Sequence, residues 1–216
     1  MAAVWQFLVK GGITMIPLGL CSMFGLAIVI MKALSLRRKN ILIPEVVSVV
    51  ESIASPKDVA LVLAVCEKHS GPLPNIIKTA LVHRGLPRDE IKELIVDQGR
   101  QEVRSLERGL VALETVAAIS PLLGLFGTVI GILKIFNVIS QMGVGQAAAL
   151  SSGISEALIT TIVGLAIGIP AVVAYNYFTN RAENLILDIE KHTSEVMSKL
   201  RSFSAREEEL PESFRS

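Results

Sequence analysis

The sequence predicts an all-α membrane protein with three transmembrane helices and long cytoplasmic helical extensions. Apolar residues make up 51% of the 216 residues and charged residues only 19%, a balance that is too apolar for a soluble domain of this length. Three stretches, residues 11–31, 115–133 and 157–180, contain no Asp, Glu, Lys or Arg. Each is close to the roughly 20 residues that a helix needs to cross the hydrocarbon core of a bilayer.

The distribution of basic residues predicts the orientation of these spans. Only Lys10 precedes the first span, whereas Lys32, Arg37 and Arg38 follow it, and residues 137–155 carry no charge. By the positive-inside rule, we expect the N-terminus in the periplasm and the C-terminus in the cytoplasm of a bacterial inner membrane. The first span is followed by charged residues rather than by a small-residue cleavage site, so we expect it to be a retained anchor in contact with membrane lipid.

Proline, glycine and apolar spacing predict how the remaining segments are organised. Prolines and glycines break the segment after the first span into short helical runs. The last run begins near Arg88 and keeps three- and four-residue apolar spacing to Leu113, so we expect it to enter the second span without a break. Leu185, Ile189 and Val196 show similar spacing, which predicts that the third span extends below the membrane and packs along the preceding helix.

Eight segments are therefore expected. They are a periplasmic N-terminus (1–10), transmembrane helix 1 (11–31), a cytoplasmic helical region (32–109), transmembrane helix 2 (110–136), a periplasmic loop (137–153), transmembrane helix 3 (154–178), a cytoplasmic helix (179–204) and a disordered tail (205–216).

Charge and cysteine patterns argue against several other classes of protein. The net charge is +1 and the basic residues are dispersed, so no nucleic-acid partner is expected. Cys21 and Cys66 are expected in different environments, which argues against a disulfide bond or a metal site. Neither a nucleotide-binding glycine loop nor paired carboxylates or a Ser-Lys pair in the spans is found in the sequence. We therefore expect no cofactor, no metal and no enzymatic activity.

The second span carries small residues that favour close helix packing. Gly127 and Gly131 form a GxxxG pair, with Gly124 on a neighbouring position, and such residues let helix backbones approach closely in lipid. Pro121 lacks a backbone N–H, so the helix is expected to bend or loosen there. Thr128 can either bond its own backbone one turn back or offer its hydroxyl to a polar pathway.

The third span places an acidic residue on a helix face whose side chains become smaller farther along the helix. Every fourth residue after Glu156 gives Thr160, Gly164 and Gly168, so this face is expected to lie against protein rather than lipid. Two readings of Glu156 stay open at this point. Serines precede it, so it could cap the start of a helix. Alternatively, it lies within the hydrocarbon, where such residues mark ion pathways or pair with a partner charge.

Two longer motifs give these residues a context. Residues 121–129, PLLGLFGTV, and residues 169–176, IPAVVAYN, flank Glu156 in the sequence. Together with Glu156 they resemble the MotA/TolQ/ExbB family of proton-channel proteins. Three spans match the ExbB and TolQ branch of that family rather than the four-span MotA flagellar stators.

The resemblance implies an assembly and a set of pathway residues. It implies a homo-pentameric ring that encloses the transmembrane helices of an ExbD- or TolR-type dimer, with a TonB-like protein as a further partner. By position, the family glutamate is Glu156, and the two family threonines are Thr128 and Thr161. Helical geometry instead puts Thr160 one turn from Glu156 and rotates Thr161 away, so both stay candidates for the proton pathway.

The resemblance also implies a function, with alternatives. The expected function is an ExbB-type subunit of a proton-driven motor that powers TonB-dependent outer-membrane transport. A TolQ-type subunit for envelope maintenance is the alternative within the family, and a passive membrane scaffold is the alternative from another class. Proton and sodium coupling stay open, because carboxylate and hydroxyl groups can serve either ion.

Overall fold

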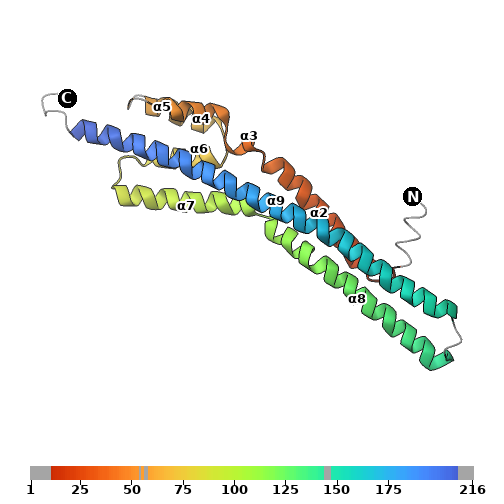
Figure 1. Cartoon of the computed structure of the whole chain (residues 1–216). Coiled ribbons are helices and arrows are strands. Elements are labelled where there is room, and N and C mark those ends of the chain that lie inside the picture. Colours follow the sequence, from red (N-terminus) through yellow and green to blue (C-terminus); the bar gives the residue numbers. More distant parts are fainter. Residues whose placement is uncertain (1–10, 54, 56–57, 144–146, 209–216) are drawn as a thin grey trace. The chain divides into compact units, whose positions relative to one another are not determined.

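The computed structural model describes residues 11–53, 55, 58–143 and 147–208, and the regular elements of these residues are all α-helices (Figure 1). The helices are α2 (Met15–Ser35), α3 (Arg38–Ile41), α4 (Pro44–Glu51), α5 (Asp58–Lys68), α6 (Pro72–Val82), α7 (Arg88–Glu107), α8 (Leu110–Met142) and α9 (Ala147–Glu208). The expected N-terminal segment 1–10 lies outside the described residues.

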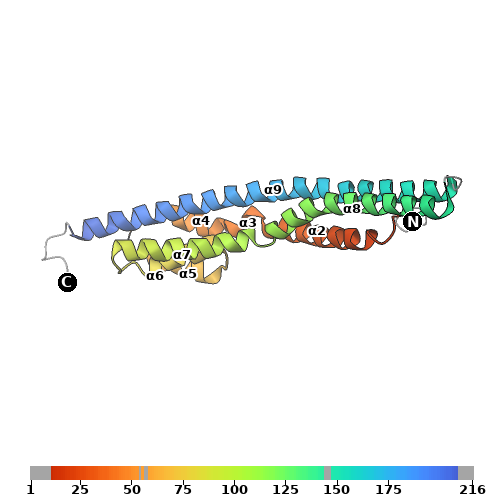
Figure 2. The same cartoon turned by 90° about the horizontal axis from the view of Figure 1, so that it is seen from below.

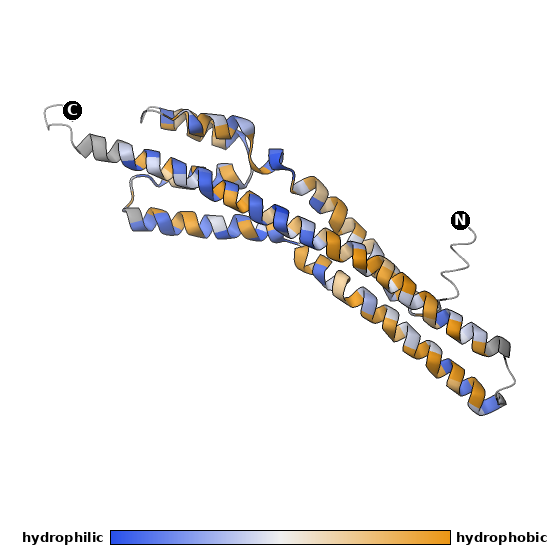
Figure 3. Ribbon diagram, viewed as in Figure 1, coloured by the Kyte–Doolittle hydropathy of each residue, from blue (hydrophilic) through white to orange (hydrophobic). Residues whose placement is uncertain are grey.

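Three helical stretches are long and apolar enough to cross a membrane. They are α2, a stretch within Asp89–Gln141 and a stretch within Leu150–Ser202. Figure 3 shows that apolar residues dominate α2, α8 and the adjoining part of α9, whereas α7 is largely hydrophilic. The predicted all-α fold with three membrane-spanning helices is thus confirmed, while the orientation of the chain stays a prediction.

The first of two compact units consists of Met1–Ala33, as far as it is described, and Gly109–Thr179. Within it, α2, α8 and the N-terminal part of α9 run side by side (Figures 1 and 2). Leu18, Leu113 and Phe178 are buried between them. Large apolar side chains on the outer faces, such as Phe24 and Leu122, are exposed, as expected for helices that meet lipid.

The second unit consists of Leu34–Arg108 and the described part of Asn180–Ser216. Its core contains Leu73, Ile77, Leu185 and Val196, so the buried face predicted from the spacing after the third span is confirmed. Lys199 donates hydrogen bonds to the carbonyl oxygens of Val50 and Glu51, at 3.0 and 2.7 Å. These carbonyls lie at the C-terminal end of α4, where backbone acceptors lack helical partners.

The prediction of one continuous helix into the second span is wrong, because the helix is interrupted between α7 and α8. Helix α7 ends at Glu107, α8 begins at Leu110, and Gly109 has a φ of 90°. This left-handed conformation costs little for glycine but is strained for residues with a Cβ atom. Apolar spacing reports which face is buried, and it is insensitive to a one-residue change of backbone conformation.

Two further expected boundaries also differ from the structure. Most of the expected loop 137–153 is helical, since α8 continues to Met142 and α9 begins at Ala147. The polar residues there were compatible with a helix that reaches beyond the apolar stretch. At the C-terminus, α9 includes residues 205–208 of the expected tail, and residues 209–216 lie outside the described part.

We predict that two glycine substitutions ten residues apart change stability in opposite directions. Gly109→Ala should destabilise the chain by about 1–2 kcal/mol because of its positive φ. Gly99→Ala, in the interior of α7, should stabilise it by up to about 1 kcal/mol, since an added Cβ there meets open space. Thermal unfolding of the detergent-solubilised protein, followed by helical circular dichroism, measures both. Equal stability of the two variants would contradict the helix break.

We predict that the Cys66 thiol reacts slowly with a maleimide in the folded protein. Cys66 is 3% exposed. Burial raises the pKa of its thiol to about 11, although the nearby Lys78 opposes this. Because the thiolate is the reactive form, its population at neutral to mildly basic pH falls by at least about a hundredfold. Labelling in a Cys21→Ser background measures the rate, before and after denaturation.

A Cys21→Ser, Cys66→Ser, Ser70→Cys variant provides the matched control for this measurement. Ser70 is exposed on the loop between α5 and α6, so a cysteine there should label rapidly without denaturant. Equal labelling rates at positions 66 and 70 would argue against the buried position of Cys66.

Candidate functional site

The three glycines of α8 that the sequence singled out all lie against α9. A Cβ atom on Gly124 would come within 2.9 Å of the backbone oxygen of Thr160, and one on Gly127 within 2.5 Å of the Thr160 hydroxyl oxygen. A Cβ atom on Gly131 would meet the backbone oxygen of Gly153 at 2.9 Å. The α8 backbone therefore touches α9 over two turns.

The small residues of α9 complete the same interface from the other side. A Cβ atom on Gly164 would lie 2.6 Å from the backbone oxygen of Ser120, and one on Gly168 would lie 2.7 Å from the ring of Pro121. Helix α8 continues through Pro121. The Ser120 hydroxyl donates to the Val116 carbonyl at 2.6 Å and is fully buried. The six residues expected to mediate packing thus lie at one helix–helix contact.

Within the length of this contact, the structure brings the hydroxyls of Thr128 and Thr161 together. Their oxygens lie 2.5 Å apart. The Thr128 hydroxyl also lies within hydrogen-bonding distance of the carbonyl oxygens of Gly124 and Ala157, at 3.2 and 3.1 Å. The Thr161 hydroxyl lies 3.3 Å from the Gly124 carbonyl oxygen. Both threonines are partly exposed, so the pair forms a polar point on the α8–α9 surface.

Thr160 has a different environment from Thr161. It is fully buried against Gly127, and its hydroxyl donates to the Ala157 carbonyl at 2.9 Å. Thr160 is therefore part of the packing between α8 and α9. Single-helix geometry favoured Thr160 as the neighbour of Glu156, whereas the contact between the two helices pairs Thr161 with Thr128.

Glu156 lies inside α9 rather than at its start. The helix begins at Ala147, so Glu156 is more than two turns from the first residue. The unpaired backbone N–H groups that a capping side chain could bind belong to the first turn. The capping reading of Glu156 is therefore wrong in this structure. Its side chain is 15% exposed and its carboxylate packs against the backbone of Gly12, just before α2.

Lys134 is the partner of Glu156, and sequence reasoning missed it. The Lys134 ammonium lies 2.5 Å from Oε1 of Glu156, and the Lys134 side chain is 52% exposed. The close contact of Gly131 with Ala157 sets the two helices at the distance that this pair requires. A signal was present in the sequence, since Lys134 is the residue that ends the second charge-free stretch. A carboxylate in hydrocarbon calls for such a partner.

The arrangement contains the groups that a proton path needs. A carboxylate can bind and release a proton, and threonine hydroxyls can both donate and accept hydrogen bonds. No group of three or more His, Cys, Asp or Glu side chains that could hold a metal ion occurs among the described residues.

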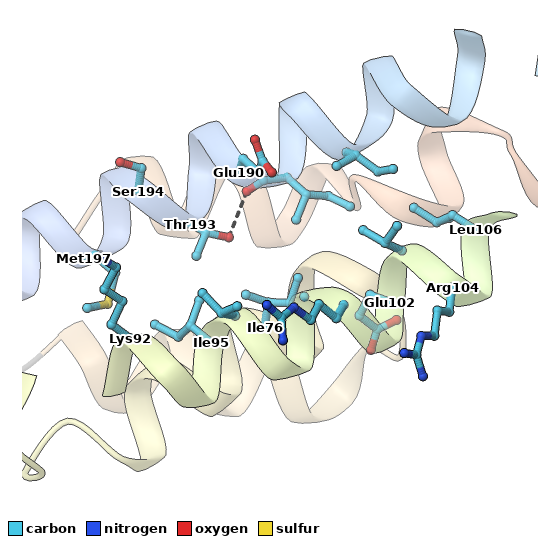
Figure 4. Close-up of a pocket in the computed structure, with 16 residues that line it drawn as sticks. Ile76, Lys92, Ile95, Glu102, Arg104, Leu106, Glu190, Thr193, Ser194 and Met197 are labelled. Atoms are coloured by element: carbon cyan, nitrogen blue, oxygen red, sulfur yellow. Dashed lines mark hydrogen bonds between the residues drawn. The ribbon is translucent and has the colours of Figure 1, made fainter. Parts of the chain in front are cut away.

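A groove lies within the second unit, on α6, α7 and α9 (Figure 4). It has a volume of roughly 720 Å³ and is lined by apolar side chains that include Ile76, Ile95 and Met197. Glu102, one of two acidic residues that line it, accepts hydrogen bonds from the amides of Asn75 and Gln98, both at 2.8 Å. These polar contacts are internal to the unit.

Comparison with known families places the membrane site in context. The model of the MotA/TolQ/ExbB proton channel family matches residues 68–191, which is more than half of the chain and includes the glycine interface, both threonines and Glu156. The chain belongs to the MotA/TolQ/ExbB proton channel family. As a member of this family, it is a multi-pass membrane protein. The family is one of proton channels rather than a known class of enzymes.

Relatives named TolQ and ExbB both match this member of the family. The Tol-Pal system protein TolQ of Pseudomonas aeruginosa is 46% identical over 86 residues, 40% of this chain and 37% of the relative. A putative biopolymer transport protein ExbB homolog of Methanothermobacter thermautotrophicus is 38% identical over 124 residues, 57% of this chain and 43% of the relative. The biopolymer transport protein ExbB of Neisseria gonorrhoeae is 36% identical over 133 residues, 55% of this chain and 60% of the relative. The matches thus span between about a third and three fifths of these relatives.

We predict that the α8–α9 interface tolerates no added methyl group at Gly164, where backbone lies against backbone. Gly164→Ala should destabilise the protein by about 1–3 kcal/mol, because its Cβ atom would press on backbone atoms of α8 that cannot move independently. Gly19→Ala on α2 is the matched control, since a Cβ atom there meets nothing within 4 Å. Thermal stability in detergent measures both variants. A Gly164→Ala protein as stable as Gly19→Ala would refute the close approach.

Proposed function

We propose that the chain is an ExbB-type subunit of an inner-membrane motor that converts the proton motive force into mechanical work for TonB-dependent outer-membrane transport. The observation that carries the proposal is the position of Glu156. This carboxylate is largely buried along α9 and held by an ion pair, and the same helix contributes Thr161 to the Thr128–Thr161 hydroxyl pair.

In this proposal, five copies of the chain form a ring around the transmembrane helices of an ExbD- or TolR-type dimer. The N-terminus faces the periplasm and the C-terminus the cytoplasm. The exposed apolar side chains of α8 and α9, among them Phe126, Val129, Leu158 and Ile162, provide surfaces for lipid and for neighbouring subunits. The proposed assembly accounts for the presence of both exposed apolar side chains and the polar pairs on α8 and α9.

Glu156 is proposed to accept and release protons at the boundary between the ring and the enclosed partner. The Thr128 and Thr161 hydroxyls provide the next hydrogen-bonding groups, and Thr160 holds the two helices together. Each charge that moves through the membrane potential releases roughly 2.3 kcal/mol per 100 mV. A few protons therefore supply enough free energy for a sizeable movement of the partner within the ring.

A TolQ-type subunit for envelope maintenance is the second candidate. It is favoured by the 46% identity to the TolQ protein of Pseudomonas aeruginosa. The larger shares of the chain matched by relatives named ExbB favour the first candidate. Both candidates use the same membrane site and differ in the protein that the motor drives, whereas a passive scaffold would conduct no protons at all.

We predict that Glu156→Gln and Glu156→Ala abolish proton transfer but not assembly. Both variants remove the titratable carboxylate, so proton uptake should fall at least about tenfold, toward the leak of empty vesicles. The chain is co-purified with its single-span partner and reconstituted, and uptake is followed with a pH-sensitive dye under an imposed potential. Glu93→Gln, an exposed acid on α7, serves as the control and should conduct like the unchanged protein. Full proton uptake by an assembled Glu156→Gln complex would refute the assigned role.

A further inference from the structure

We propose that Lys134 is a specificity-determining residue that reserves Glu156 for protons by taking the place beside the carboxylate that a sodium ion would need. This inference rests on the proposed ion-conducting function. The observation behind it is the contact of 2.5 Å between the Lys134 ammonium and Oε1 of Glu156.

The helix contact holds this pair in place. Gly131 lets α8 approach Gly153 and Ala157 of α9, and Lys134 follows Gly131 by about one turn. On another side, the carboxylate packs against the backbone of Gly12, where a side chain would not fit. Among the described residues, the charged group that faces Glu156 from α8 is therefore Lys134, and Gly12 contributes its backbone.

The pair also lies well inside the helices that form it. Helix α8 ends at Met142, so Lys134 is eight residues (142 − 134) and about 12 Å from that end along the helix axis. Glu156 is similarly far from the start of α9 at Ala147. The Glu156 side chain is 15% exposed, so its charge is screened less by salt than a charge in open solvent, whereas Lys134 is 52% exposed.

Coordination chemistry gives the pair its selectivity. A sodium ion in a protein needs oxygen ligands, and the side-chain oxygens that Glu156 offers are the two of its carboxylate. An ammonium group provides hydrogen-bond donors and no acceptor. With Lys134 in place, sodium loses access to Oε1 and meets a like charge within a few ångströms. A proton needs one lone pair, and it can bind the carboxylate while Lys134 stays charged.

The test measures sodium binding at Glu156 directly, without requiring ion conduction. The full chain, co-purified with its single-span partner, is treated with dicyclohexylcarbodiimide, which reacts with protonated carboxyl groups in apolar surroundings. Labelling is compared in sodium chloride and in choline chloride at equal ionic strength and pH. Glu156→Gln gives the background from other carboxyl groups.

Lys134→Gln should make labelling sensitive to sodium, whereas the unchanged protein should label at the same rate in both salts. Competition slows labelling about tenfold when sodium is at about ten times its dissociation constant. Lys134→Arg keeps the positive charge and should behave like the unchanged protein. A purely structural role of Lys134 would not create a dependence on sodium.

Several outcomes would overturn the inference. These are sodium-insensitive labelling of Lys134→Gln, sodium-sensitive labelling of the unchanged protein, and sodium sensitivity of Lys134→Arg equal to that of Lys134→Gln. Lys134→Met is a second neutral variant of similar length. Failure of both neutral variants to assemble, while Lys134→Arg assembles, would assign Lys134 a structural role instead.

Proton uptake by the same preparations separates this inference from the proposed function. Absence of uptake by the unchanged complex, together with sodium-sensitive labelling of Lys134→Gln, would refute the motor while supporting the exclusion of sodium by Lys134. Normal uptake with sodium-insensitive labelling of Lys134→Gln would support the motor and refute the role of Lys134.

Discussion

The close approach of the α8 and α9 backbones is the constraint on which the membrane site depends. Glycines on both helices leave room for the backbone of the other helix, so their separation is set by main-chain atoms rather than by flexible side chains. In lipid, where apolar side chains gain little by leaving the solvent, such van der Waals contact is a main source of helix association. A fixed separation in turn lets short polar side chains reach across the interface.

Two polar pairs use this fixed separation. The Thr128–Thr161 hydroxyls and the Lys134–Glu156 ion pair each join one residue of α8 to one of α9. Unpaired polar groups are costly in an apolar medium, and an unpaired charge is costlier still. The packing between α8 and α9 therefore determines which polar side chains can pair. The glycines carry no reactive group, yet they set the distances within both pairs.

The sequence singled out the candidate site residues more readily than the contacts between them. Glu156 was identifiable because an acid beside a long apolar stretch needs an explanation, but a capping role was equally open until the start of α9 at Ala147 was known. The relation of Thr160 and Thr161 to the site could not be derived from one helix, because the partner helix decides which of them is covered. Lys134 was overlooked for the same reason, since it lies 22 positions from Glu156 in the chain.

Composition and periodicity alone determined that the chain is helical, that it has three spans and that its C-terminal helix has a buried apolar face. These properties follow from local sequence, because hydrophobic length and spacing act within one helix. Only the tertiary structure decided the helix break at Gly109, the burial of Thr160 and the pairing of Lys134 with Glu156. Backbone conformation at a single residue and contacts between helices depend on the neighbouring elements, and no pattern within one segment contains that information.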